Sequence, residues 1–67
     1  MLQIAHNLKR LRKSKGETQL SLSSKLGLSK NHIAMIEQNK ANPSIKQLEE
    51  IARILDVPVK EFFRDIP

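Results

Sequence analysis

Five side chains between residues 30 and 35 are better suited to contact another molecule than to fill a hydrophobic core. Lys30, Asn31 and His32 carry hydrogen-bonding groups, Ala34 is small and Met35 is flexible. A helix that displays such a face has the size and the chemistry that a DNA major groove accepts. Whether these residues form one face depends on the elements around them.

Two short helices joined by a tight turn are predicted over residues 18–37. Thr18 and Ser29 each carry a hydroxyl that can accept the unpaired amides at a helix start, so the second helix is expected over about residues 29–37. Gly27 follows the first helix, where a residue without a Cβ can adopt a positive φ and let the chain reverse. Five apolar side chains can meet in the angle between the helices: Leu22, Leu26, Leu28, Ile33 and Ile36. This helix-turn-helix motif, about residues 19–38, leaves the five side chains described above on its outer face.

A further helix is predicted on the N-terminal side of the motif. Residues 2–15 place Ile4, Leu8 and Leu11 on one helical stripe. Gly16 is expected to end this helix.

Two more helices are predicted after the motif. Asn39 is expected to adopt a left-handed conformation in a polar loop, and Ser44 with Gln47 fits a capping box that begins the fourth helix. The buried stripe of this helix is predicted to be Ile45, Leu48, Ile51, Ala52 and Leu55. The last helix, about residues 59–64, begins after Pro58 and should bury Phe62 and Phe63. The expected fold class is all-α, a compact five-helix domain that occupies residues 1–67.

Composition argues against several other kinds of site. The chain has no Cys, and its two histidines, His6 and His32, lie in no cluster with metal-ligand spacing, so no metal site is expected. The serines are placed as caps and helix surface, without a histidine and acid to activate one. The two glycines stand alone and form no phosphate loop. We therefore expect no enzyme activity, no cofactor and no small-molecule ligand.

Charge and hydropathy suggest where the chain acts. Residues 1–40 hold eight Lys or Arg against two Glu, whereas residues 41–67 hold four against five acids. This asymmetry favours contact between the first part and a polyanion, although ordinary solvated helix faces would look similar. No apolar run has membrane length and no signal-peptide core is present, so a cytoplasmic protein without membrane contact is expected.

The order and spacing of these elements resemble the Xre/Cro-type helix-turn-helix transcriptional regulators, whose lambdoid phage members are well-known examples of groove-binding helices. The resemblance covers essentially the whole chain and implies a lambda-repressor-like DNA-binding domain. The motifs that carry it are Leu11-Arg12-Lys13, Gly16, Thr18-Gln19, Leu26-Gly27-Leu28-Ser29, Ile33, Ile36-Glu37, Asn42-Pro43-Ser44 and Ile51-Ala52. It implies a sequence-specific regulator that binds double-stranded DNA as a homodimer on a palindromic operator.

The resemblance also implies which residues contact DNA. The base-reading positions of the family correspond to Lys30, Asn31, Ala34 and Met35, with His32 at the margin. Lysine can donate to guanine, asparagine can bond adenine, and the two apolar side chains can contact a thymine methyl. The phosphate-contacting positions correspond to Thr18 and Gln19 at the start of the first motif helix, and to Gln38, Asn39, Lys40 and Asn42 in the following loop.

Four other positions gain meaning from the resemblance. Arg12 and Glu37 occupy positions that in many members form a mostly buried ion pair, the alternative being two exposed charges. Ser23 replaces the usual Ala, and its hydroxyl is expected to bond back to a carbonyl of its own helix. Leu20 stands where the family is normally polar, as an isolated surface residue or as a contact with a partner protein.

The end of the fourth helix is the expected dimer interface. Ile54 lies beside the buried stripe, and Val57, Pro58 and Val59 continue the apolar surface. In the resembling repressors this end of the domain meets its mate, while the alternative is that Ile54 packs on the last helix.

A second class of function also stays open. The chain could be an antitoxin-like protein-interaction module that binds DNA secondarily. The resemblance does not separate a phage repressor, a restriction-modification controller and the DNA-binding part of a larger regulator, and it does not identify the operator.

Overall fold

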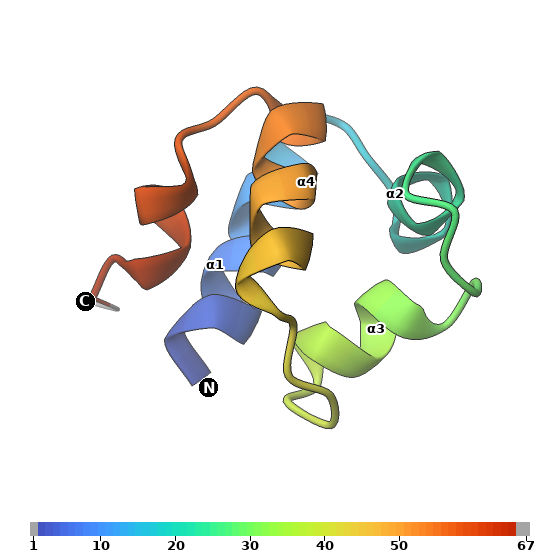
Figure 1. The fold of residues 1–67 in the computed structure, drawn as a ribbon, viewed down its shortest axis with the longest axis horizontal. Helices are drawn as coiled ribbons and strands as arrows, with labels where there is room; N and C mark the ends of the chain where they lie inside the picture. The colour runs from blue at the N-terminus through green and yellow to red at the C-terminus, as the bar shows by residue number, and fades with distance from the viewer. Residues whose placement is uncertain (1, 66–67) are drawn as a thin grey trace.

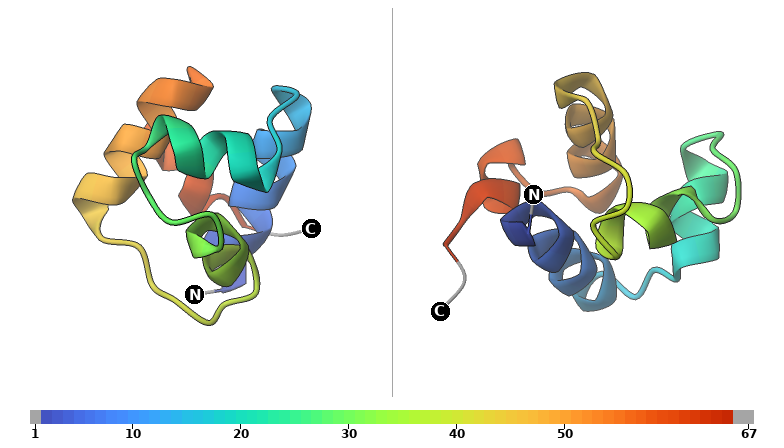
Figure 2. Two further views of the ribbon diagram at one scale, coloured as in Figure 1. Left: turned by 90° about the vertical axis from the view of Figure 1, so that its right-hand side faces the viewer. Right: turned by 90° about the horizontal axis from the view of Figure 1, so that it is seen from below.

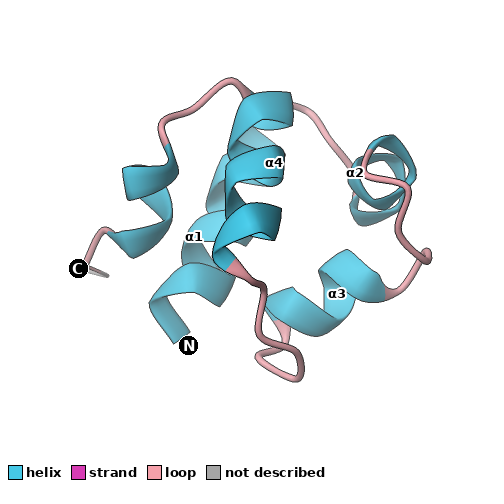
Figure 3. Cartoon of the chain, viewed as in Figure 1, coloured by secondary structure: helices cyan, strands magenta, loops and turns pink. Residues whose placement is uncertain are grey.

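The computed structural model describes residues 2–65, which form helices and loops and no strand (Figures 1 and 3). The helices are α1 (Leu2–Ser14), α2 (Gln19–Lys25), α3 (His32–Glu37), α4 (Ile45–Leu55) and the 3-10 helix η1 (Val59–Phe63). The all-α prediction is confirmed. The fifth predicted α-helix is instead a single short 3-10 segment, in which the amide of Glu61 bonds the carbonyl of Pro58 at 3.0 Å. Five residues are too few for an α-helix to close more than its first turn, and 3-10 geometry is common in such short pieces.

Two of the helices begin with the side-chain caps that their sequences predict. The hydroxyl of Thr18 accepts from the amide of Ser21 at 2.9 Å, and the hydroxyl of Ser21 accepts from the amide of Thr18 at 2.9 Å. At α4, Ser44 accepts from the amide of Gln47 at 3.0 Å, and the Gln47 side chain accepts from the amide of Ser44 at 3.3 Å. Each box satisfies two donors that a helix start leaves without partners, so both boundaries follow from local sequence.

The chain reverses direction through residues with positive φ. Gly16 and Gly27 have φ of 73° and 69°, and Asn39, as predicted, has φ of 60°. Asp56 ends α4 at φ 57°, which the sequence did not indicate. Asn and Asp tolerate this region better than most residues that carry a Cβ, so all four turns have suitable residues.

The start of α3 differs from the prediction. The helix begins at His32 rather than near Ser29, and its N-cap residue Asn31 makes no side-chain cap bond. Ser29 contributes its backbone carbonyl, which accepts from the amide of His32 at 3.0 Å. Lys30 and Asn31 therefore lie in the turn that precedes α3.

One hydrophobic core joins all the helices. Its buried members are Ile4, Leu8, Leu11, Leu22, Ile33, Ile36, Leu48, Ile51, Ala52, Leu55 and Phe62. Two predicted core residues are wrong, because Ile45 is 64% exposed and Phe63 is 44% exposed. Ile45 is the first residue of α4, at the edge of the packed layer. Phe63 follows the fully buried Phe62, and successive residues of a 3-10 helix point about 120° apart.

The helices pack so that α3 lies between α1 and α2. α1 packs against α3 and η1, α2 packs against α3, and α4 packs against η1. The left view of Figure 2 shows α2 lying across α3 with the turn joining them at one side. In Figure 1, α4 runs away from α3, so its carboxyl end lies far from that helix. Within residues 2–65, no helix has the length and apolar character needed to cross a membrane.

Candidate nucleic-acid interface

The inner faces of α2 and α3 meet in a small apolar contact, and a buried serine lies beside it. Leu22, Ile33 and Ile36 are fully buried or nearly so. Ser23 is also fully buried, and its hydroxyl accepts from the amide of Ile33 at 3.4 Å. The expected bond from this hydroxyl to a carbonyl of its own helix stays a prediction, because a hydroxyl oxygen that accepts from α3 can still donate its proton. The bond from Ile33 fixes the approach of the two helices at the turn.

The last residue of α3 is anchored by an ion pair inside the protein. The Arg12 guanidinium donates to both carboxylate oxygens of Glu37, with Nε–Oε2 at 2.6 Å and Nη2–Oε1 at 3.1 Å. The two side chains are only 8% and 3% exposed. Arg12 also donates to the carbonyl of Glu17 at 2.8 Å, and Gln19 donates to Glu37 Oε1 at 3.0 Å. Glu37 thereby links α1, α2 and α3 through charge-assisted bonds, which holds the orientation of α3.

The outer side of α3 presents the residues that the sequence singles out. Asn31, Ala34, Met35, Gln38 and Lys40 line one surface hollow of about 350 Å³. Lys30 is exposed in the preceding turn and His32 is half-buried, and neither lines the hollow. The structure thus brings together three of the five predicted base-contacting residues and two of the predicted phosphate-contacting residues.

The loop after α3 is bonded back onto the helix that precedes it. The amides of Lys40 and Ala41 donate to the carbonyl of Met35 at 2.8 and 3.3 Å, and the amide of Gln38 donates to the carbonyl of Ala34 at 3.0 Å. The side chains of Gln38, Asn39, Lys40 and Asn42 are exposed. Because the loop backbone is tied to α3, the backbone of Lys40 keeps a defined position beside the helix, and its flexible stem lets the ammonium group reach a nearby phosphate.

The start of α2 carries a charge cluster that sequence reasoning missed. Glu17 accepts from the hydroxyl of Ser21 at 2.6 Å and forms an ion pair with Lys25. Hydrogen bonds from Lys25 and then Ser21 hold the pKa of Glu17 below its usual value of 4.5. The sequence did contain a signal for this cluster. Glu17 directly precedes the N-cap residue Thr18, and a negative side chain near the N-terminus of a helix interacts favourably with the helix dipole.

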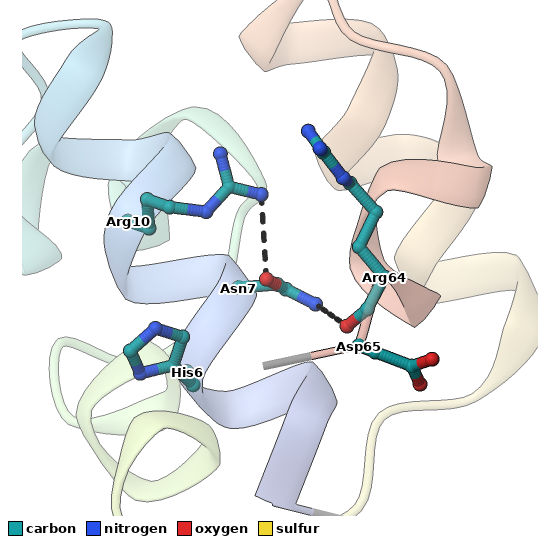
Figure 4. Close-up of a pocket in the computed structure, with 5 residues that line it drawn as sticks. All are labelled: His6, Asn7, Arg10, Arg64 and Asp65. Atoms are coloured by element: carbon teal, nitrogen blue, oxygen red, sulfur yellow. Dashed lines mark hydrogen bonds between the residues drawn. The ribbon is translucent and has the colours of Figure 1, made fainter. Parts of the chain in front are cut away.

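A second hollow lies between α1 and the C-terminal segment (Figure 4). It measures about 240 Å³ and is lined by His6, Asn7, Arg10, Arg64 and Asp65. The buried amide of Asn7 donates to the carbonyls of Phe62 and Arg64 at 3.0 and 2.9 Å, and Asn7 accepts from Arg10 at 3.3 Å. Sequence reasoning missed Asn7, although it lies on the stripe of Ile4 and Leu8. Its bonds attach α1 to the segment that contains η1.

The predicted dimer residues lie at the end of α4 and the start of η1. Ile54, Val57 and Val59 are half-buried and pack against the core, and Pro58 is exposed. Ile54 therefore contacts its own domain with part of its surface and leaves the rest accessible.

Comparison with known proteins places this geometry in one family. A model of the helix-turn-helix family matches residues 8–62. The chain is 40% identical over 57 residues to the HTH-type transcriptional regulator SinR of Bacillus subtilis, covering 84% of this chain and 51% of SinR. It is 36% identical over 56 residues to the immunity repressor of Bacillus phage phi105, covering 84% of this chain and 39% of that protein.

A solved structure shows the same fold. The chain superimposes on the hypothetical transcription factor NHTF from Neisseria with a TM-score of 0.88 and 24% identity, covering 94% of this chain and 72% of that one. This chain spans about half the length of SinR and less of the phage repressor. From the matched residues and the shared arrangement of α2, turn and α3, the chain belongs to the Xre-type family of helix-turn-helix regulators.

Proposed function

We propose that this chain acts as a sequence-specific DNA-binding domain of a transcriptional regulator. The supporting observation is the hollow beside α3, where Asn31, Ala34, Met35, Gln38 and Lys40 lie together. A base edge in the major groove needs hydrogen-bonding and apolar side chains on one exposed helix face, and this hollow offers both. The names of the relatives, a transcriptional regulator and an immunity repressor, support the same reading.

The turn before α3 and the first residues of α3 read the bases in this proposal. Lys30 and Asn31 lie in the turn before α3 and are exposed. Their polar side chains are the ones that extend into the major groove ahead of the helix. Ala34, which is half-buried, and the exposed Met35 follow on the helix and contact apolar groups such as the thymine methyl. His32, half-buried beside them, contributes least.

Phosphate contacts flank this face on two sides. Thr18 and Gln19 begin α2, and Gln38, Asn39, Lys40 and Asn42 follow α3. The Thr18 hydroxyl already caps α2, and the Gln19 amide already bonds Glu37, so both groups are held in place before DNA arrives. Such contacts fix the register of a protein on the duplex and depend on salt.

Two copies are proposed to bind one palindromic operator. One short helix covers few base pairs, so a homodimer with half-sites about one helical turn apart gives useful specificity. Ile54, Val57, Pro58 and Val59 form the proposed dimer surface, because they join into one partly exposed apolar edge. This edge lies at the end of α4 that points away from α3 (Figure 1).

The proposed place of action is the bacterial cytoplasm, where DNA is accessible.

Selection of bound sequences from random DNA duplexes tests the proposal. The parent chain should enrich an inverted repeat whose half-sites lie about 10 base pairs apart, or a multiple of that spacing. Asn31→Ala should relax the preference at one base pair of each half-site, and Lys60→Ala on η1 serves as a surface control. Enrichment of no sequence over a range of salt concentrations, with the parent folded, would reject sequence-specific binding.

A protein-interaction module is the second candidate, because Leu20 on α2 is 61% exposed. A large apolar side chain in that position fits a protein partner that binds beside α2. If so, a stoichiometric partner should copurify with the parent, and Leu20→Glu should remove it while Ile45→Glu, at a similarly exposed isoleucine, should not. Operator binding that is unaffected by Leu20→Glu, without any copurifying protein, favours the first candidate.

A further inference from the structure

The buried hydroxyl of Ser23 contacts the start of α3. The first amides of any helix lack partners inside the helix and need acceptors from elsewhere. At α3 the N-cap residue Asn31 supplies none from its side chain, and the amide of His32 uses the carbonyl of Ser29 at 3.0 Å. The amide of Ile33, a fully buried residue, donates instead to Ser23 Oγ at 3.4 Å.

Ser23 also anchors the turn that leads to α3. Its carbonyl accepts from the amides of Leu26 and Leu28 at 3.2 and 2.9 Å, and Gly27 between them has φ of 69°. This is the bonding pattern that closes a helix on a left-handed residue. One residue therefore holds the end of α2 through its backbone and the start of α3 through its side chain.

An alternative start for α3 is available in the same sequence. If Ser29 capped the helix, the amide of Ile33 would bond the carbonyl of Ser29 in the ordinary i to i−4 pattern. Lys30 and Asn31 would then lie on the first helical turn. Asn31 already has near-helical φ and ψ of −95° and −3°, so the larger change would fall on Lys30. The acceptor on Ser23 removes the need for that longer helix, because it satisfies the Ile33 amide without it.

We propose that Ser23 is a positioning residue that sets the start of α3 and, through it, the placement of Lys30 and Asn31. Its hydroxyl touches no DNA and acts through the backbone of Ile33. The consequence for base preference rests on the proposed function, whereas the consequence for the helix start does not.

The first test compares the free parent with Ser23→Ala and with the matched control Ser24→Ala, which alters an exposed serine next to it on α2. Alanine adds no atoms and favours helix, so α2 has no steric reason to unfold. In Ser23→Ala, amide hydrogen exchange of Ile33 should become about tenfold faster, since a buried donor loses its acceptor. A shift of the Cα resonance of Lys30 towards helical values would equally support the proposal, because the helix would then start earlier.

Unchanged exchange of Ile33 together with an unchanged Cα resonance at Lys30 would overturn the role of Ser23. Ser23→Cys keeps the size of the side chain and replaces the acceptor with a weaker one, so it should move both measurements in the same direction by less.

The second test repeats the selection of DNA sequences with the same three proteins. Ser23→Ala should alter the preference at the base pairs that respond to Lys30→Ala or Asn31→Ala, and Ser24→Ala should leave the preference as in the parent. An unaltered preference in Ser23→Ala would overturn the link to base reading. If the parent selects no sequence, the proposed function fails, and the exchange measurement still decides the role of Ser23.

Discussion

At the scale of single residues, the orientation of the candidate interface depends on a buried ion pair beneath α3. Glu37 is almost fully buried and receives bonds from Arg12 and Gln19. Removing two charges from water costs about as much as their attraction returns, so the pair contributes geometry more than net stability. Loss of one partner is a different matter, because the remaining charge stays buried without compensation.

Arg12→Ala should therefore destabilise the domain by about 3–5 kcal/mol. A core of this size rarely supplies more than about 3–5 kcal/mol in total, so the variant should lose most of its cooperative unfolding. Urea denaturation followed by circular dichroism measures this, with Lys13→Ala at an exposed neighbour as the control. A decrease in the free energy of unfolding of less than about 1 kcal/mol is typical of an exposed ion pair and would contradict the burial of Arg12 and Glu37.

Two exposed residues should separate base reading from phosphate contact. Asn31→Ala should cost about 1–3 kcal/mol on the best operator and much less on poor ones, because only the correct base bonds the amide bidentately. Lys40→Ala should weaken binding to all sequences alike and lower the salt slope by about 1. Fluorescence titrations at several salt concentrations measure both effects. If Lys40→Ala changed the base preference and kept the salt dependence of the parent, Lys40 would contact a base rather than a phosphate.

At the scale of elements, α2 illustrates how a short helix is stabilised from its ends. Seven residues are too few for a stable isolated helix, so capping and tertiary contacts must hold it. Thr18 and Ser21 close the first turn reciprocally, and Glu17 bonds Ser21 as well as Lys25. These groups surround the positive end of α2, near which Gln19 is proposed to contact phosphate.

Acid should weaken this arrangement in a defined direction. The folded state lowers the pKa of Glu17 below 4.5, through bonds from Lys25 and Ser21, so the ionised carboxylate is the stabilising form. Its contribution is present above the usual pKa and is lost as the pH falls through the lowered value. The parent should therefore be more stable than Glu17→Gln at pH 7, and the difference should vanish in strong acid.

Urea denaturation of the two proteins at both pH values measures this difference. Glu49→Gln, at an exposed position of α4, is the matched control and should show no comparable convergence. A Glu17→Gln variant whose deficit is equally large in acid would show that the side chain stabilises α2 without its charge.

At the scale of the whole molecule, the domain separates its two proposed contact surfaces by the length of α4. That helix begins beside the loop after α3 and ends at Leu55, and its cap residue Asp56 leads into Val57 and the start of η1 (Figure 1). α1 holds η1 through Asn7, which donates to the carbonyls of Phe62 and Arg64. The edge formed by Ile54, Val57, Pro58 and Val59 is thus attached rigidly to the part that is proposed to read DNA.

Ile54→Lys should dissociate the proposed dimer, because a charge buried against a partner is costly. Sedimentation measures the mass, and circular dichroism checks that the helices persist. Ile45→Lys is the matched control, since it changes the same residue type at the other end of α4, where the side chain is 64% exposed. An Ile54→Lys protein that still forms dimers would place the interface elsewhere.

The sequence by itself determined the features that arise within a few residues of each other. The caps at Thr18 and Ser44, the left-handed Asn39 and the order of the helices follow from local hydrogen bonding and hydrophobic periodicity, and the structure contains each of them. The spacing likewise predicted that Ile33 and Ile36 are buried and that Met35 is exposed, while Ala34 is half-buried. Such features depend on interactions that the chain makes with its own neighbouring residues.

Tertiary structure alone decided the features that join distant residues. Ser29 is a good local cap, yet α3 begins at His32, and Ser23, ten residues before Ile33 in the chain, supplies an acceptor for the Ile33 amide. Asn7 meets a carbonyl 55 residues away, and neither bond has a signature in local sequence. The exposure of Ile45 likewise depends on how far the packed layer extends over α4. These outcomes are set by which elements meet and at what angle, and that follows from packing the whole core rather than from any one segment.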